Sequence, residues 1–210
     1  MSGARRIREL VLATRNRHKS SELTALLSDV GIRIRTLADV PAAPEVVEDG
    51  ETCEANAVKK AATIAKFTGL LTLADDTGLM VEALGGRPGV HAARYAGPQA
   101  TYEDNWRKLL SELEGVPRDQ RRARFVTVVA LATPDGNPPR VVEGVLEGLI
   151  AEQPAGTRGF GYDPVFFVPE MGKTLAELTP NEKNRVSHRA RALAKVREII
   201  TRTKRNLVIE

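Results

Sequence analysis

The sequence has little cysteine and no long hydrophobic run. Cys53 is the single cysteine among 210 residues, so no internal disulfide can form and a reducing compartment is expected. No apolar stretch approaches the roughly 20 residues of a membrane-spanning helix, so no membrane association is expected. Basic Arg5, Arg6 and Arg8 precede only a short apolar run, Leu10 to Ala13, too short for a signal-peptide core. We therefore expect a cytoplasmic protein.

Charge is distributed unevenly along the chain. The formal net charge is +4, yet residues 183–205 alone carry +8, from nine Lys or Arg residues and one Glu. Such a block indicates a polyanionic partner or, alternatively, a helix whose basic face is solvated. Aromatic residues, 4% of the chain, form no stripe beside this block. A stable nucleic-acid partner is therefore not expected.

The order of apolar patterns predicts a mixed α/β fold. The length fits one large domain or two intimate lobes. Strands and helices alternate early in the chain, and a pair of strands follows that resembles an antiparallel hairpin. Strands are predicted at residues 7–13, 32–37, 70–74, 79–84, 124–133 and 140–152, and helices at 53–67, at 102–114 and after Lys19 up to a stop at Gly31.

The segment around which the chain is organised runs from Leu70 to Leu79. A short apolar run ends there in Asp75 and Asp76, and Gly78 follows. Adjacent carboxylates repel unless a cation, a hydrogen-bond donor or water relieves them. We expect the strand to end at these residues and bend at Gly78, because both carboxylates can approach one ion only if the chain bends. A solvated Asp-rich turn is the alternative.

Two further segments have residue types suited to phosphate and metal ions. Thr14, Asn16 and Lys19 lie where a helix begins, and the free N–H groups of such an end bind phosphate. The glycines of a Walker loop are absent. A polar cap with a surface lysine is the alternative. In the acidic loop that follows, Glu48 is a candidate metal ligand, although acids near a helix start are favoured by the dipole anyway.

Glycine alternates with aromatic residues in residues 156–164. Phe160 offers a stacking face to a flat ring, and Asp163 offers acceptors. A glycine-rich turn anchored by a core Phe is the alternative. Downstream, Lys183 and His188 would point about 140° apart on one continuous helix. We therefore expect a break between them, with Ser187 capping a new helix.

These segments occur in an order that resembles the inosine triphosphate pyrophosphatases, a family acting on non-canonical purine nucleoside triphosphates. The resemblance covers residues from about Arg8 to Arg202. It rests on the motifs Thr14-x-Asn16-x-x-Lys19, Asn56-Ala57, Ala74-Asp75-Asp76-Thr77-Gly78-Leu79, Gly85-Gly86-x-Pro88-Gly89, Ala93-Arg94-Tyr95, Phe160-Gly161-Tyr162-Asp163-Pro164 and Lys183 with Ser187-His188-Arg189.

The resemblance implies one two-lobed domain over residues 1–210, with a mixed β-sheet flanked by helices and an active-site cleft between the lobes. It implies a homodimer that uses Mg²⁺ to cleave ITP, dITP or XTP to the monophosphate and pyrophosphate, which removes damaged bases from the nucleotide pool. A pyrophosphatase for modified pyrimidine nucleotides is the alternative enzyme. A non-enzymatic nucleic-acid binder that uses the basic C-terminal helix is the alternative from another class.

Site residues carry over by motif. Asp76 is the expected catalytic carboxylate and, with Glu48, the expected metal ligand; Glu48 is chosen because Ala55 stands where the family often has Glu. Thr77 is expected to touch phosphate. The triphosphate is expected at Thr14, Arg15, Asn16, Arg17, His18 and Lys19, and the base at Phe160, Gly161, Tyr162, Asp163, Lys183, His188 and Arg189.

Base choice can be argued from the donors. Hypoxanthine and xanthine present a 6-keto acceptor, whereas adenine presents a 6-amino donor. Donors from Lys183, His188 or Arg189 would pair with the first and stay unpaired against the second. A site that leaves buried polar groups unpaired can reject a substrate by factors of about 10⁴–10⁵. Guanine is also 6-keto, so its exclusion needs a feature beyond these donors.

Overall fold

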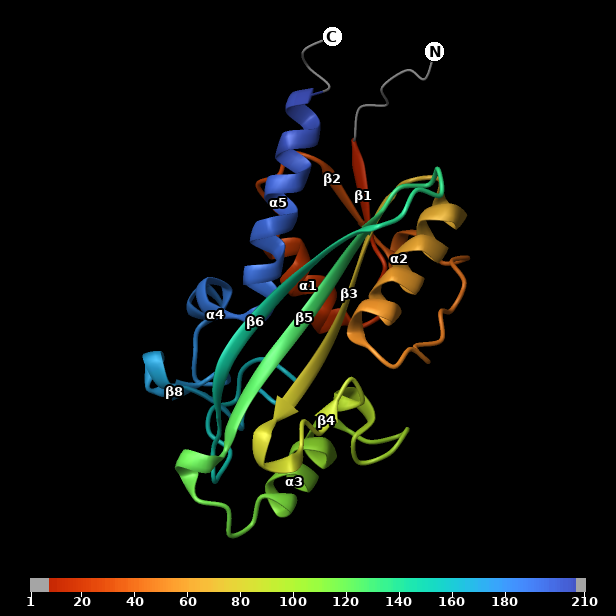
Figure 1. The fold of residues 1–210 in the computed structure, drawn as a ribbon. Helices are drawn as coiled ribbons and strands as arrows, with labels where there is room; N and C mark the ends of the chain where they lie inside the picture. The colour runs from red at the N-terminus through yellow and green to blue at the C-terminus, as the bar shows by residue number, and fades with distance from the viewer. Residues whose placement is uncertain (1–7, 207–210) are drawn as a thin grey trace. The chain divides into compact units, whose positions relative to one another are not determined.

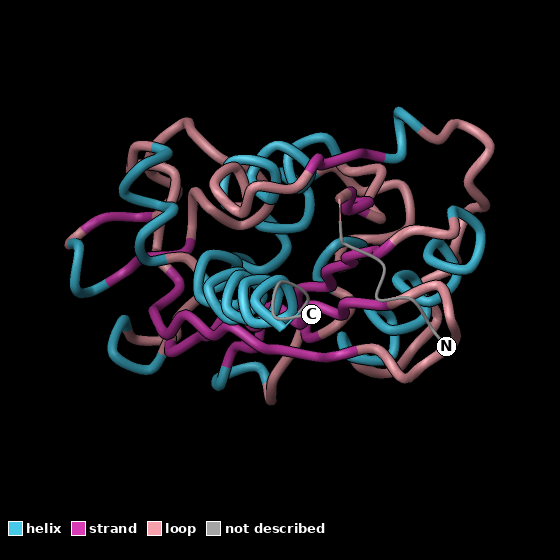
Figure 2. The backbone as a smooth tube through the Cα atoms, turned by 90° about the horizontal axis from the view of Figure 1, so that it is seen from above, coloured by secondary structure: helices cyan, strands magenta, loops and turns pink. Residues whose placement is uncertain are grey.

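The computed structural model describes the backbone of residues 8–206 and the side chains of residues 8–202. Ile7 of the first predicted strand and the side chains of Lys204 and Arg205 lie outside this range. Strands and helices alternate in the first part of the described chain, whereas the last four strands follow one another without an α-helix between them (Figures 1 and 2). The strands are β1 Glu9–Leu12, β2 Arg33–Thr36, β3 Leu71–Val81, β4 Pro88–Gly89, β5 Arg122–Ala132, β6 Arg140–Ile150, β7 Phe166–Val168 and β8 Lys173–Thr174. The helices are α1 Arg17–Leu26, α2 Cys53–Thr68, α3 Tyr102–Glu112, α4 Pro180–Val186 and α5 His188–Asn206.

The strands form one sheet in the order β2-β1-β3-β5-β6-β7-β8, with β4 paired to β3. β1 is parallel to β2 and to β3, whereas β4 is antiparallel to β3 and β7 is antiparallel to β6 and β8. Residues 133–139 join the neighbouring strands β5 and β6. So short a connection cannot make a parallel crossover, so this pair is antiparallel. The predicted mixed α/β fold is confirmed.

Strand β3 differs from its prediction. It continues unbroken through Asp75, Asp76 and Gly78, so the expected strand end and bend are wrong. Nearly every residue of β3 is buried, and the two carboxylates meet buried cations from other elements. Because cations neutralise the two carboxylates inside the protein, the carboxylates do not depend on water, and the chain does not have to turn toward solvent here. Because neighbouring side chains of a strand point to opposite faces, Asp75 and Asp76 serve different surroundings.

The chain divides into two compact units. The first includes residues up to Asp76, Val128–Gly144 and the chain from Arg189, and the second includes Thr77–Thr127 and Val145–His188. Strands β3, β5 and β6 contribute residues to both units. The chain passes from one unit to the other several times, among other places between Asp76 and Thr77 and between His188 and Arg189.

The first unit has its own hydrophobic core. Helix α1 contributes Leu23 and its C-cap is Leu27, and helix α5 contributes Leu193, Val196 and Ile200, all fully or almost fully buried. Helix α1 ends at Leu26, not at Gly31 as expected, because a series of turns follows Leu27.

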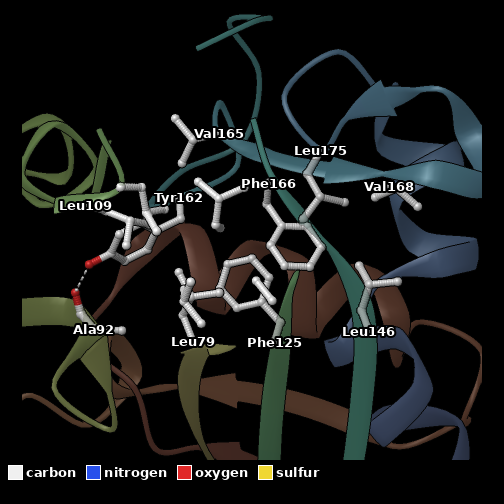
Figure 3. Packing of buried hydrophobic residues seen from close by; sticks show 14 of the residues in the cluster. Leu79, Ala92, Leu109, Phe125, Leu146, Tyr162, Val165, Phe166, Val168 and Leu175 are labelled. Carbon is white, nitrogen blue, oxygen red and sulfur yellow. Dashed lines mark hydrogen bonds between the residues drawn. The ribbon is translucent and has the colours of Figure 1, made fainter. Parts of the chain in front are cut away.

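The second unit is built around a separate core (Figure 3). The ring centroids of Phe125 and Phe166 lie 4.6 Å apart, and the hydroxyl of Tyr162 donates to the carbonyl of Ala92 at 2.8 Å. Helix α3 packs here through Trp106, Leu109 and Leu110, together with its C-cap Leu113.

The predicted break between Lys183 and His188 is confirmed. Helix α4 begins with the capping box of Thr179 and Glu182 and ends at Val186. Ser187 has extended dihedral angles, φ −64° and ψ 153°, and α5 begins at the next residue. Among residues 8–206, no helix combines the length and the apolar character that crossing a membrane requires.

Candidate active site

Charged residues, four of them buried and two partly exposed, meet around β3 in the first unit. We call these residues the carboxylate cluster: Lys19, Glu48, Lys60, Asp75, Asp76 and Arg189. Oδ2 of Asp75 accepts from Nη2 and Nε of Arg189, at 3.1 and 3.3 Å, and lies 3.3 Å from Nζ of Lys19. Nη1 of Arg189 donates to Glu22 of α1 at 2.6 Å. Burial alone would raise the pKa of Asp75, but Lys19, Arg189 and Lys60 outweigh it and hold the pKa well below its usual range.

Asp76 lies on the other face of β3. Nδ2 of Asn56 donates to its Oδ2 at 3.1 Å, and Nζ of Lys60 lies 3.9 Å from its Oδ1. Burial raises the pKa of Asp76, and Lys60, Lys19 and Asn56 offset that rise only in part. Burial also raises the pKa of the nearby Cys53 thiol to about 12, so this cysteine stays protonated at neutral pH. Because its pKa is raised whereas that of Asp75 is lowered, Asp76 is the better proton acceptor of the two adjacent carboxylates.

The carboxylates of Glu48 and Asp76 both lie near Nζ of Lys60. Nζ of Lys60 donates to Oε1 of Glu48 and to the carbonyl of Asp75, both at 2.7 Å. No three His, Cys, Asp or Glu residues gather to hold a metal ion within residues 8–206. Mg²⁺ does not require such a group, because it takes one or two carboxylates and completes its shell with water and substrate phosphates. The pair of Glu48 and Asp76 fits that pattern.

The loop from Thr14 to Lys19 caps helix α1. Oδ1 of Asn16 accepts from the backbone N–H groups of His18 and Lys19, at 3.0 and 3.2 Å, so the polar-cap interpretation of Asn16 is confirmed. The guanidinium of Arg15 donates to the carbonyl of Ala43 at 2.7 Å. A surface hollow of about 780 Å³ is lined by Thr14, Arg15, Arg17, Ser20, Ser21, Thr24, Ala25, Thr36, Leu37, Ala38 and Pro41.

The second unit brings together the predicted base residues. We call Phe125, Thr127, Phe160, Asp163, Lys183 and His188 the aromatic cluster. Nζ of Lys183 donates to Oδ2 of Asp163 at 2.5 Å and lies 5.0 Å from the ring centroid of Phe160. The same Oδ2 accepts from the backbone N–H of Phe160 at 2.8 Å. Asp163 thus ties the lysine to the loop that presents the aromatic ring.

The loop before Asp163 needs glycine. Gly159 has φ +76°, and a Cβ atom there would lie 2.0 Å from Oδ2 of Asp163. A side chain would therefore displace the contact that orients Lys183. Tyr162 is buried in the core with its hydroxyl donated to Ala92, so only its backbone is left for a ligand.

His188 is held by a hydroxyl and a ring. Its Nδ1 lies 2.6 Å from Oγ1 of Thr127, which in turn lies 2.7 Å from Oγ1 of Thr77. Phe125 stacks on the imidazole, with centroids 4.6 Å apart and 28° between the planes. Both contacts fix the plane of the histidine ring.

Comparison with known proteins identifies the group to which the chain belongs. A model of the Ham1 family matches residues 10–199. The chain belongs to the Ham1 family. Its relatives include a protein named dITP/XTP pyrophosphatase from Geobacillus kaustophilus, 52% identical over 91% of this chain and 94% of the relative. Another with that name, from Bacillus subtilis, is 45% identical over 92% and 98%. The predicted resemblance is confirmed.

Solved Ham1-family structures share the fold. A HAM1 protein from Coxiella burnetii superposes with a TM-score of 0.84 at 42% identity, covering 93% of this chain and all of that one. A Mycobacterium abscessus structure, titled nucleoside-triphosphatase / dITP/XTP pyrophosphatase, gives 0.72 at 46% identity, over 90% and 98%.

Several residues of this Ham1-family site were not predicted from the sequence. Asn56 and Lys60 lie four residues apart on α2, a spacing that places both on one face, and this signal was available. Thr127 is a fully buried hydroxyl within the otherwise apolar part of β5 that begins at Phe125. Arg189, expected at the base, instead pairs with Asp75 in the first unit.

Proposed function

We propose that this protein hydrolyses non-canonical purine nucleoside triphosphates (dITP, XTP and ITP) to the monophosphate and pyrophosphate. The observation that carries the proposal is the convergence of Glu48 and Asp76 on a buried cationic position, with further cations close by. Relatives at about half identity over nine tenths of the chain are named for this activity.

The reaction breaks the bond between the α-phosphorus and its bridging oxygen. Water attacks the α-phosphorus, and pyrophosphate leaves with the bridging oxygen. Such a transfer requires positioning and charge neutralisation more than covalent help. Lys19 and Lys60 supply fixed positive charge, and Asp76 accepts a proton from the attacking water or orients it. Mg²⁺, held by Glu48 and Asp76, would neutralise phosphate charge when bound.

We assign the triphosphate to the first unit and the base to the second. Thr14 to Lys19, with the N-terminus of α1, would receive phosphate oxygens. Thr77, which follows Asp76 directly, would touch phosphate as well. Arg189 acts on this substrate indirectly, because its guanidinium neutralises Asp75 and Glu22.

We assign base choice to donors of the aromatic cluster. Lys183 and His188 can donate to the 6-keto oxygen of hypoxanthine or xanthine, and Phe160 offers a stacking face. The backbone of Gly161 and Tyr162 and the carboxylate of Asp163 complete the loop. Adenine would place its amino group against these buried donors and leave them unpaired. Such a mismatch can lower kcat/KM for the adenine nucleotide by factors of up to about 10⁴–10⁵.

The test is substrate profiling. Purified protein with Mg²⁺ is incubated with ITP, dITP, XTP, GTP, ATP and modified pyrimidine nucleotides, and the products are separated. We expect pyrophosphate and monophosphate, fastest from the first three. Release of orthophosphate, a preference for ATP, or a preference for a pyrimidine would overturn the proposal.

The resemblance also predicts a homodimer of the cytoplasm. Light scattering after size-exclusion chromatography tests the oligomeric state, since a monomer at micromolar concentration would contradict the predicted homodimer. A nucleic-acid binder using α5 is less well supported, because two of its basic side chains already have partners: Lys195 donates to the carbonyl of Glu143, and Arg197 pairs with Asp29. That alternative predicts salt-sensitive binding of DNA or RNA without turnover.

A further inference from the structure

Three side chains of the second unit form a continuous hydrogen-bonded row. Thr77 of β3, Thr127 of β5 and His188 at the start of α5 are joined by contacts of 2.7 and 2.6 Å. Thr127 is fully buried, and the imidazole is 4% exposed. The row ends at Nδ1 of His188, a residue that we assign to recognition of the base. Its middle residue, Thr127, has no role of its own in the proposed reaction.

Proton bookkeeping leaves two arrangements of this row. A threonine hydroxyl has one proton and two lone pairs, and where Thr127 uses its proton within the row it donates to one neighbour and accepts from the other. In one arrangement Thr77 donates to Thr127, which donates to Nδ1 of His188. In the other arrangement Nδ1–H of His188 donates to Thr127, which donates to Thr77.

The two arrangements give the histidine different recognition properties. When Nδ1 accepts, a neutral imidazole carries its proton on Nε2 and is a donor at that atom. When Nδ1 donates, a neutral imidazole has an acceptor at Nε2, which would match a 6-amino group. Phe125 covers one face of the imidazole, so the ring makes its hydrogen bonds in its own plane, through Nδ1 and Nε2.

We propose that Thr127 is a positioning residue that sets base choice by holding His188 as the Nε2–H tautomer. This inference rests on the proposed function, because a donor at Nε2 matters only when His188 faces a 6-keto purine. The hydroxyl of Thr127 touches no substrate in this scheme. It acts through the imidazole, whose plane Phe125 fixes.

A tautomer measurement tests the row directly and needs no turnover. Protein labelled with ¹⁵N-histidine contains His18, His91 and His188, and the variants His18→Asn and His91→Asn identify the resonances of His188. Long-range ¹H–¹⁵N correlations then show which ring nitrogen carries the proton. We expect Nε2–H in the wild type and in Thr127→Ser, and loss of that preference in Thr127→Val, which keeps the shape and lacks the hydroxyl.

A kinetic ratio tests the consequence. We expect kcat/KM for ITP relative to ATP to fall about tenfold in Thr127→Val, the size of one buried hydrogen bond, and to stay near wild type in Thr127→Ser. A merely structural role would lower both rates together and leave their ratio unchanged, which would overturn the inference. If Thr127→Val does not fold, the wild-type tautomer decides: Nδ1–H refutes the inference and Nε2–H supports it.

The two measurements separate this inference from the proposed function. Selective ITP hydrolysis with His188 protonated at Nδ1 leaves the proposed function standing and removes the role of Thr127. Absence of ITP hydrolysis with Nε2–H and the expected change in Thr127→Val removes the proposed function and keeps the tautomer assignment.

Discussion

The two clusters solve different physical problems. The carboxylate cluster places full charges in buried surroundings and neutralises each with at least one opposite charge. The aromatic cluster contains the ion pair between Lys183 and Asp163, together with stacked rings and hydrogen-bonded hydroxyls. A triphosphate requires strong, largely undirected neutralisation, whereas a choice between a keto and an amino group requires a few directed donors.

The same contrast recurs between two adjacent residues. Asp75 has its pKa held down by Lys19, Arg189 and Lys60, whereas burial raises the pKa of Asp76. We infer that Asp75 stabilises the fold and Asp76 carries chemistry. Variants of the two should therefore fail in different assays.

The largest expected effect is on turnover in Asp76→Asn. The amide keeps the shape and loses the charge and the proton acceptor, so kcat for ITP should fall by about 10³-fold, with the melting temperature nearly unchanged. Steady-state kinetics with thermal melting measure both. A variant retaining full turnover would show that Asp76 has no part in the chemistry.

Asp75→Asn should reverse this pattern. Removing one partner of a buried ion pair leaves Arg189 and Lys19 incompletely neutralised, so the free energy of unfolding should fall by about 3–5 kcal/mol. Urea unfolding measures the change. If Asp75→Asn unfolds at the same urea concentration as the wild type, the division of roles between the two carboxylates is wrong.

Lys183→Met should affect substrate use in the second unit. Loss of a charged donor should lower kcat/KM for ITP by about 10- to 100-fold, mainly through a higher KM, because the donor acts on the base and not on the phosphate. Lys173→Met is the matched control, since Lys173 is exposed and lies outside both clusters. Equal losses in the two variants would argue against a specific role for Lys183.

Glu48→Gln should raise the concentration of Mg²⁺ that activity requires. With one acidic ligand neutralised, the Mg²⁺ concentration for half-maximal activity should rise about tenfold, while saturating Mg²⁺ should restore much of the rate. Glu45→Gln, an exposed acid in the same loop, is the control. An unchanged Mg²⁺ dependence would remove Glu48 from the metal site.

The smallest effect is expected at the cap of α2, the helix that carries Asn56 and Lys60. Thr52 accepts from the N–H of Ala55 at 3.1 Å, so Thr52→Ala should cost about 1 kcal/mol of stability. Thr63→Ala, in the interior of the same helix, should cost nothing, because alanine favours helix more than threonine does. Chemical unfolding of both variants measures the difference.

Local signals in the sequence predicted much of the fold. The break at Ser187 follows from residue types within a few positions, and it is confirmed. The course of β3 was mispredicted because its decisive contacts are distant: Arg189 lies 114 residues from Asp75. Such partners let carboxylates stay inside a strand where local preference predicts a turn.

The site was predicted unevenly for the same reason. Phe160, Asp163 and Lys183 come from conspicuous segments, and the structure brings them together. Thr127 lies within the apolar run of β5, where nothing nearby in the sequence marks its hydroxyl as a partner of His188. Arg189 directly follows His188, yet it contacts a different set of residues.

The unbroken course of β3 makes the spacing of the chain as important as its composition. Deleting one residue between Leu71 and Asp75 would slide the pairing of the strand, exchange the faces of the two acids, and bring the chemical carboxylate against the guanidinium that now neutralises its neighbour. An evolving lineage can therefore replace apolar residues of this stretch far more readily than it can lengthen or shorten it.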